Sequence, residues 1–268
     1  MSKEEKELSF LQHLEVLRWH LVRAVSSIVI FAVLAFIYKD FVFDQVLLAP
    51  KNPNFPTYRF FCSLSDFLGM GELLCFGDQK WDLHSFTMSG QFSTHIITSL
   101  FAGFFIAFPY VFWEIWRFVK PALYSKETSI TRGVVFFTSI LFSVGVLFGY
   151  YLVAPLSVNF LGSYQVSSQV SNTIGLGSFV SIITTISFAN GLIFELPMLV
   201  YFLTKIGLLT PEFMKQYRKH AIVLTLILSA IITPPDVTSQ ILVSLPLIIL
   251  YEISIRISAS VLKNQNKL

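Results

Sequence analysis

Long runs of apolar residues, separated by short charged segments, dominate the pattern of hydrophobic and polar positions along the chain. Continuous apolar runs of roughly 20 residues are typical of transmembrane helices, whereas a β-barrel would show alternating apolar and polar positions. The pattern therefore predicts an all-α integral membrane protein with six transmembrane helices, of which the last two are short. The expected spans are Leu21–Tyr38, Thr94–Phe112, Gly133–Val153, Phe179–Thr204, Ala221–Thr233 and Val237–Tyr251.

We expect these spans to form a single six-helix membrane domain over residues 1–268, with a long exterior loop over residues 39–92 between the first two spans. The first apolar run is too long for a cleavable signal peptide and lacks a small-residue cleavage site. It follows an amphipathic segment that predicts a cytoplasmic helix running directly into the first span.

Composition and charge agree with a membrane protein and give its orientation. The chain is 54% hydrophobic and 13% charged, whereas soluble domains have about 25% charged residues. Of the 19 lysines and arginines, only Lys39, Lys51, Arg59 and Lys80 fall in the exterior loop, and the other 15 lie on the side that holds both termini. The positive-inside rule therefore predicts cytoplasmic termini in a multi-pass protein of the cell (cytoplasmic or inner) membrane. The net charge of +3 reflects this topology and does not support nucleic-acid binding.

Glu195 is the only charged residue in the 72 residues between Arg132 and Lys205. A charge at mid-membrane costs several kcal/mol, so such residues face a cavity, a partner helix or a substrate path. The alternative is a neutral carboxyl group that forms hydrogen bonds inside the helix bundle. Pro197 cannot donate a hydrogen bond to the carbonyl of Ile193, and the fourth span is therefore expected to kink near Glu195.

Other prolines predict further irregularities in the helices. Pro109 is expected to bend the second span near its end. Pro235 is expected to stop the short fifth span, and Asp236 is well placed to cap the start of the sixth.

The remaining polar residues indicate no catalytic or metal centre. Cys62 and Cys75, both in the exterior loop, could form a disulfide in an oxidising environment or remain two free thiols. Two cysteines with only His84 nearby do not provide the ligands of a metal site. Because no catalytic motif occurs either, we expect a protein that is not an enzyme and that has no cofactor and no metal.

Four motifs in this order resemble the TatC family, the multispanning receptor subunits of the twin-arginine protein translocase. They are Phe10–Arg18 before the first span, Phe118–Glu127 in the first cytoplasmic loop, Phe194–Pro197 in the fourth span and Thr233–Gln240 before the last span. The resemblance covers nearly the whole chain, and only the long exterior loop with its cysteine pair departs from shorter members of the family.

The resemblance implies a function in the export of folded proteins driven by the proton-motive force. Implied partners are twin-arginine signal peptides, single-span subunits of the TatA/TatB type and other TatC copies. The implied signal-peptide residues are Glu15, Glu127, Arg18 and Phe118; the implied partner-helix residues are Glu195, Gln240 and Pro197; Pro121 is implied to be structural. Carboxylates suit this recognition because a guanidinium group can bind one in bidentate geometry.

Two other functions are alternatives to that of a signal-peptide receptor. A proton-coupled small-molecule transporter would use Glu195 to load and release a proton, but many such transporters contain internal repeats and the two halves of this sequence show none. A structural scaffold subunit would lack a peptide site. In that reading Glu15 and Arg18 form an ordinary exposed pair on a helix surface, three residues apart.

Overall fold

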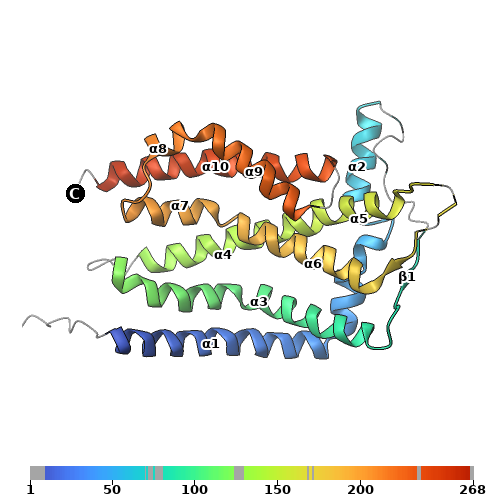
Figure 1. Cartoon of the computed structure of the whole chain (residues 1–268), viewed down its shortest axis with the longest axis horizontal. Helices are drawn as coiled ribbons and strands as arrows, with labels where there is room; N and C mark the ends of the chain where they lie inside the picture. Colours follow the sequence, from blue (N-terminus) through green and yellow to red (C-terminus); the bar gives the residue numbers. More distant parts are fainter. Residues whose placement is uncertain are drawn as a thin grey trace, which may run out of the picture. The chain divides into compact units, whose positions relative to one another are not determined.

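The computed structural model describes residues 10–69, 71, 75, 81–123, 130–167, 169–170, 172–233 and 237–265. Its elements are almost all helical (Figure 1). The helices are α1 (Phe10–Ile37), η1 (Phe41–Leu47), η2 (Ala49–Lys51), α2 (Pro56–Phe67), α3 (Gly90–Leu123), α4 (Ile130–Phe148), η4 (Gly149–Val153), α5 (Ala154–Ser163), α6 (Leu176–Ile193), α7 (Leu196–Lys205), α8 (Pro211–Gln216), α9 (Arg218–Ile232) and α10 (Val237–Gln265). Two strands of two residues, β1 (Leu83–His84) and β2 (Ile174–Gly175), pair in parallel.

Within the described residues, five stretches are long and apolar enough to cross a membrane. They are Leu14–Ile37, Gly90–Val119, Gly133–Ser163, Leu176–Lys205 and Ser239–Lys263. The prediction of an all-α membrane protein is confirmed. The fifth predicted span, Ala221–Thr233, corresponds to most of α9, which has 15 residues and is therefore only about 22 Å long, so the count of six stays a prediction.

The prediction that the last helix is short was wrong. The apolar run stops at Tyr251, but α10 continues to Gln265 and has 29 residues. Two of the polar residues that follow pair with other helices: Glu252 Oε1 lies 2.8 Å from Arg218 Nε of α9, and the buried hydroxyl of Ser258 accepts a hydrogen bond of 2.9 Å from Thr204 of α7. Contacts between helices thus extend the element beyond its hydrophobic stretch.

The described chain divides into two compact units. Unit 1 comprises Met1–Ile37 and Ser99–Ser139, and unit 2 comprises Tyr38–Thr98 and Ile140–Leu268. In unit 1, Ala24 of α1 packs with Ala107 and Val111 of α3, in a small buried cluster. A continuous six-helix domain over the whole chain stays a prediction.

In unit 2, glycines bring the backbones of two spans into contact. A Cβ atom added to Gly145 of α4 would lie 2.6 Å from the carbonyl oxygen of Asn190, and one added to Gly149 of η4 would lie 2.9 Å from Cα of Ser187. Both neighbours belong to the backbone of α6. Small residues permit such close packing in membranes, where van der Waals contact drives the association of helices because lipid leaves little hydrophobic driving force.

The N-terminal turn of α2 is bound to the continuous run formed by α4, η4 and α5. Pro155 has no N–H group, so the carbonyl of Tyr151, four residues earlier, loses its usual helical donor. The hydroxyl of Thr57 donates a hydrogen bond to that carbonyl. The hydroxyl of Tyr58 lies 3.1 Å from the carbonyl oxygen of Pro155 and is fully buried. The proline thus creates the acceptor that holds α2 in place.

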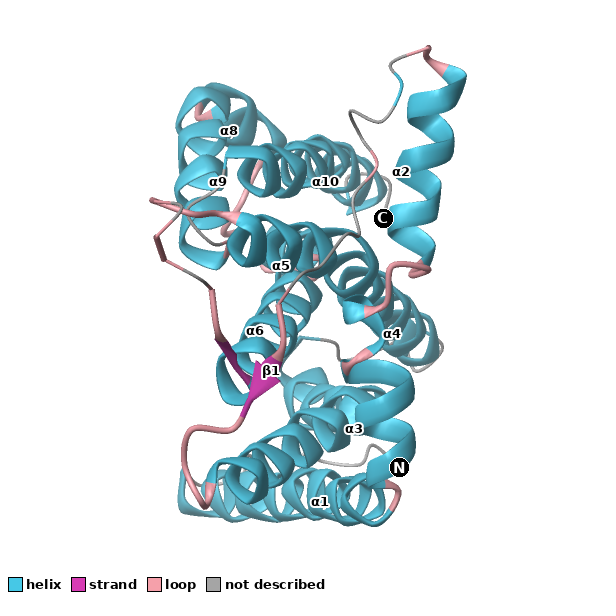
Figure 2. Cartoon of the chain, turned by 90° about the vertical axis from the view of Figure 1, so that its right-hand side faces the viewer, coloured by secondary structure: helices cyan, strands magenta, loops and turns pink. Residues whose placement is uncertain are grey.

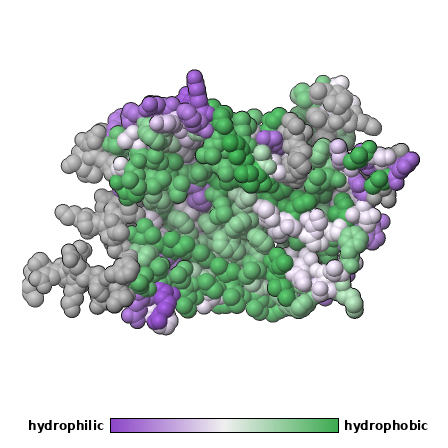
Figure 3. Space-filling view, in the orientation of Figure 1, coloured by the Kyte–Doolittle hydropathy of each residue, from purple (hydrophilic) through white to green (hydrophobic). Residues whose placement is uncertain are grey.

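Figure 3 shows the surface that results. The visible side chains along the long helices are largely hydrophobic, and hydrophilic residues gather mainly toward the ends of the helices. Many large apolar side chains are more than a third exposed, among them Val25, Val29 and Val33 of α1. This distribution is that of a protein whose helix surfaces face lipid rather than water.

Gly145→Ala is expected to destabilise the fold by about 1–3 kcal/mol, because the added methyl group meets backbone atoms of α6 that cannot move aside. Gly133→Ala is the matched control in the same helix, since nothing lies within 4 Å of its added Cβ atom and alanine favours helix. The check is the unfolding temperature of each purified variant in detergent. Equal unfolding temperatures for the two variants would contradict the close packing of α4 on α6.

Candidate functional site

The first turns of α1 carry the exposed part of the sequence-predicted peptide site. The side chains of Glu15 and Arg18 are 64% and 65% exposed, and Glu15 Oε1 lies 3.7 Å from Arg18 NH2. Exposed pairs of this kind contribute only about 0–1 kcal/mol. The carboxylate of Glu15 is therefore free to exchange Arg18 for another cation. Glu127 lies outside the described residues.

Phe118, near the end of α3, is half-buried and touches α1. Its ring makes an edge-on contact with the imidazole of His20, with ring centroids 6.2 Å apart. The structure thus joins one sequence-predicted site residue to a histidine that the sequence interpretation did not single out.

His20 belongs to a cluster around one buried carboxylate, which we call the Glu114 clamp: Glu114 and Tyr110 of α3 with His20 and Arg23 of α1. Glu114 is only 1% exposed. One carboxylate oxygen, Oε2, pairs with His20 Nδ1 and lies 3.4 Å from Arg23 Nε; the other, Oε1, accepts a hydrogen bond of 3.1 Å from the Tyr110 hydroxyl. Every partner comes from unit 1, so the clamp fixes α1 against α3 one to two turns from Glu15.

Sequence reasoning missed the clamp although a signal was present. Glu114 stands between Trp113 and Trp116 in a strongly apolar stretch, which is the same kind of position that drew attention to Glu195. Because the charged Arg117 follows one turn later, the sequence pattern around Glu114 is that of an exposed acid near a helix end. Only the fold shows that its carboxylate is buried.

Glu195 lies where the fourth span is interrupted. Helix α6 ends at Ile193, Phe194 and Glu195 form a turn, and α7 begins at Leu196 with Pro197 in its first turn. The kink expected at Pro197 is confirmed, in the stronger form of a break between two helices. Within the described chain, Glu195 Oε1 is buried and has no hydrogen-bond partner.

The polar surroundings of this break are also incompletely satisfied. Asn190, one turn before the break, is fully buried, and its amide nitrogen donates to the carbonyl of Ile186 at 2.8 Å. Its side-chain oxygen has no partner in the described part of the chain. Two buried acceptors, on Asn190 and Glu195, therefore lack donors, and a buried acceptor without a donor costs about 1–3 kcal/mol.

The structure places the other predicted residues as follows. Gln240 of α10 is half-buried, and its amide nitrogen lies 3.5 Å from the carbonyl of Leu226 in α9; among the described residues no hydrogen bond joins it to Glu195. Pro109 lies inside α3, which continues through it. Pro121 falls in the last turn of α3, but its side chain is outside the described residues, as are Pro235 and Asp236.

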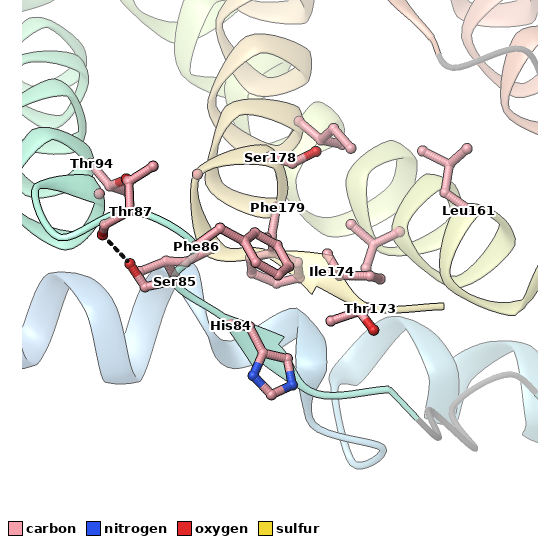
Figure 4. A pocket seen from close by; sticks show the side chains of 16 residues that line it. His84, Ser85, Phe86, Thr87, Thr94, Leu161, Thr173, Ile174, Ser178 and Phe179 are labelled. Carbon is pink, nitrogen blue, oxygen red and sulfur yellow. Dashed lines mark hydrogen bonds between the residues drawn. The ribbon is translucent and has the colours of Figure 1, made fainter. Parts of the chain in front are cut away.

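Cys62 and Cys75 are joined in a disulfide. It connects α2 to the chain that returns toward β1, so the exterior loop is closed on itself. Below this loop, β1, β2, the start of α6 and α5 surround a depression of about 530 Å³ (Figure 4). His84, Ser85 and Phe86 line one side of it, with Phe179 and Leu161 on the helices opposite. Its side chains are mostly apolar or hydroxylated, and none of those lining it is a carboxylate, lysine or arginine.

Comparison with known proteins identifies a family for almost the entire chain. The family model described as "Sec-independent protein translocase protein (TatC)" matches residues 12–246. The chain is 37% identical over 266 residues to the Sec-independent protein translocase protein TatC of Blattabacterium sp. subsp. Periplaneta americana, covering 99% of this chain and 100% of that protein. It is 43% identical over 163 residues to the TatC protein of Helicobacter pylori, covering 61% and 64% of the two chains.

A solved structure shows the same fold. The crystal structure of the twin-arginine translocase receptor TatC in DDM matches with a TM-score of 0.70 and 31% sequence identity, over 91% of this chain and 97% of that chain. A second crystal structure of the receptor matches with a TM-score of 0.69 over 93% of this chain.

The Glu114 clamp predicts that substitutions of His20 and Glu114, which are 94 positions apart, have strongly coupled effects on the free energy of unfolding. His20→Ala is expected to destabilise the protein by roughly 3 kcal/mol, because it leaves a buried carboxylate short of a partner. Glu114→Ala on the same background removes that charge, so the double variant should be more stable than the sum of the single losses implies, by about 0.5–3 kcal/mol. Unfolding of the four proteins in one detergent measures the coupling, and strictly additive losses would rule it out.

Proposed function

Because the chain belongs to the TatC family and is a receptor component of the twin-arginine translocase, a multi-pass membrane protein that acts in transport and not as an enzyme, we propose that Glu15 and Glu127 hold the two arginines of a signal peptide. In this proposal Phe118 packs beside the bound peptide, and Arg18 is the cation that the peptide displaces from Glu15.

The observation that carries the proposal is the exposed carboxylate of Glu15 on a rigid support. Its only ion pair in the described chain is the long contact with Arg18, which is weak in water. A guanidinium group that binds in bidentate geometry would form a stronger interaction. The Glu114 clamp holds α1 and α3 together next to Glu15 and Phe118, so the receptor need not order these helices when the peptide arrives.

We further propose the topology that the site requires. The helix α9 crosses as the short fifth of six spans, around which the bilayer thins to match about 22 Å. Both termini then lie in the cytoplasm, with Glu15 and the segment containing Glu127 on the side where precursors arrive. The asymmetry of lysines and arginines along the sequence supports this orientation.

The second part of the proposal concerns assembly. The interrupted fourth span presents Glu195 Oε1 without a donor, and a polar side chain from a single-span partner of the TatA/TatB type would supply one. Pro197 keeps the helix open at this point, and Gln240 contributes to the same partner surface; other TatC copies complete the assembly. Hydrogen bonds between membrane helices contribute on average about 0.6 kcal/mol each. Glu195 therefore determines the position of the partner helix more than its affinity.

Glu15→Gln and Glu127→Gln are each expected to weaken binding of a twin-arginine peptide about tenfold or more, since hydrogen bonds to charged groups contribute about 1.5–3 kcal/mol. Lysine at either position should weaken it further by repulsion. Glu212→Gln, an exposed acid in the first turn of α8, is the control and should leave affinity unchanged. Peptide affinity of the purified protein is the measurement. Unchanged affinity in the Glu15→Gln/Glu127→Gln double variant would refute the assignment.

Substitutions of Glu195 distinguish partner binding from proton transfer. Glu195→Gln keeps shape and hydrogen bonding, so export of a folded precursor should largely survive. Glu195→Ala and Glu195→Leu should reduce co-purification of the single-span partner more than they reduce peptide binding. If Glu195 transferred protons, as in a proton-coupled transporter, Gln would be as damaging as Ala because an amide does not titrate. Loss of export in Glu195→Gln with partner binding intact would exclude the docking role.

A further inference from the structure

Among the described residues, helix α2 buries one face against the rest of unit 2. Its buried residues are Thr57, Tyr58 and Ser65. The hydroxyls of Thr57 and Tyr58 bind carbonyls of η4 and α5, and Phe55, just before the helix, stacks on the ring of Tyr151 with centroids 5.6 Å apart. These contacts fix the first turn of α2 and leave its outward surface uncovered.

The uncovered surface has two chemically distinct faces. Phe60 and Phe67 are 59% and 86% exposed, seven residues apart and so on one side of the helix. Arg59, Ser63 and Asp66 are also exposed and share another side. At about 100° per residue, the buried face points about 130–150° away from each of the other two, and the apolar face lies about 85° from the polar face, with Ser63 at the boundary between them and Asp66 farthest from the phenylalanines. A helix in water would gain nothing from two exposed phenylalanines in line, whereas a helix at a membrane surface needs an apolar face.

The point where α2 is attached lies at the level of a bilayer boundary. The run from Gly133 to Ser163 contains 31 residues, about 46 Å of helix, against a hydrocarbon core of roughly 30 Å. Counted from Gly133, which follows the charged Arg132, the core ends near Val153. Thr57 and Tyr58 bind the carbonyls of Tyr151 and Pro155, on either side of that residue.

The direction of α2 also fits a membrane surface. Figure 1 shows α2 running across the long helices of unit 2, at the end where α6 and α10 begin. Figure 2, which looks along these helices, places α2 at the rim of the unit rather than over its middle. The neighbouring surface of the spans is exposed and apolar, with Leu147 52% and Tyr151 44% exposed. The apolar face of α2 therefore continues a surface that faces lipid.

We propose that α2 lies in the head-group region of the bilayer, parallel to the membrane surface, with Phe60 and Phe67 inserted among the lipid chains and Arg59 and Asp66 facing water. The partner of this surface is the lipid bilayer itself. Its first turn is held by Thr57 and Tyr58, and the Cys62–Cys75 disulfide ties its middle to the returning chain. The long exterior loop thereby forms a fixed anchor at the edge of the receptor.

Site-directed spin labelling tests the proposal. Because Cys62 and Cys75 are bonded to each other, a single new cysteine can be labelled without reducing agent, and the unsubstituted protein serves as the blank. Labels at Phe60→Cys and Phe67→Cys report the apolar face, and a label at Asp66→Cys, about 100–120° around the same helix, is the matched control. The proteins are reconstituted in vesicles of phosphatidylcholine and phosphatidylglycerol, and the accessibility of each label to oxygen and to a water-soluble nickel complex is measured.

Insertion predicts that the ratio of oxygen to nickel accessibility is several-fold higher at positions 60 and 67 than at position 66. Similar ratios at the three positions, with full access of nickel, would overturn the proposal. A second copy of the chain covering α2 would instead produce dipolar broadening between labels at position 67, which disappears on dilution with unlabelled protein, and this result would also overturn it. Use of two apolar positions keeps the test decisive if one variant fails to fold.

Discussion

Inside a bilayer no water replaces a lost backbone hydrogen bond, so each interruption of a helix in this chain needs a partner from elsewhere in the protein or from a neighbour. Two prolines create such interruptions in unit 2. At Pro155 the deficit is met internally, because Thr57 donates to the carbonyl of Tyr151. At Pro197 the helix breaks, and Glu195 Oε1 and the side-chain oxygen of Asn190 stay without donors in the described chain. The first interruption therefore attaches α2 to its span, and the second lies beside two buried side-chain acceptors that have no donor in the described chain.

The same constraint explains why glycine is needed next to the break. Gly145 and Gly149 let α4 and η4 approach the backbone of α6 so closely that a Cβ atom would overlap it. With little hydrophobic drive between helices in lipid, such contact supplies the packing that holds the interrupted span in place. The turn at Glu195 is thus held by this packing as well as by its own backbone hydrogen bonds, such as that from Glu195 N–H to the carbonyl of Leu192 at 3.1 Å.

In unit 1 the two helices are held together by a buried carboxylate instead of by a proline and its partner. Glu114 is buried with His20, Arg23 and Tyr110 around it. A buried charge group gives little net stability, but it is costly to break apart, and it therefore favours one arrangement of α1 and α3. Near this fixed point Glu15 stays exposed and weakly paired, which is the state that a binding carboxylate requires.

The sequence by itself determined that the chain is an all-α membrane protein, which family it resembles, and that the fourth span is interrupted at Pro197, because apolar runs and prolines act over a few residues. Only the tertiary structure decided that Glu114 is buried with His20, that Cys62 bonds Cys75, that α10 extends past Tyr251, and that α2 has three faces. Each of these depends on which distant segments meet in space, since a polar residue is buried or exposed according to neighbours that local periodicity does not specify.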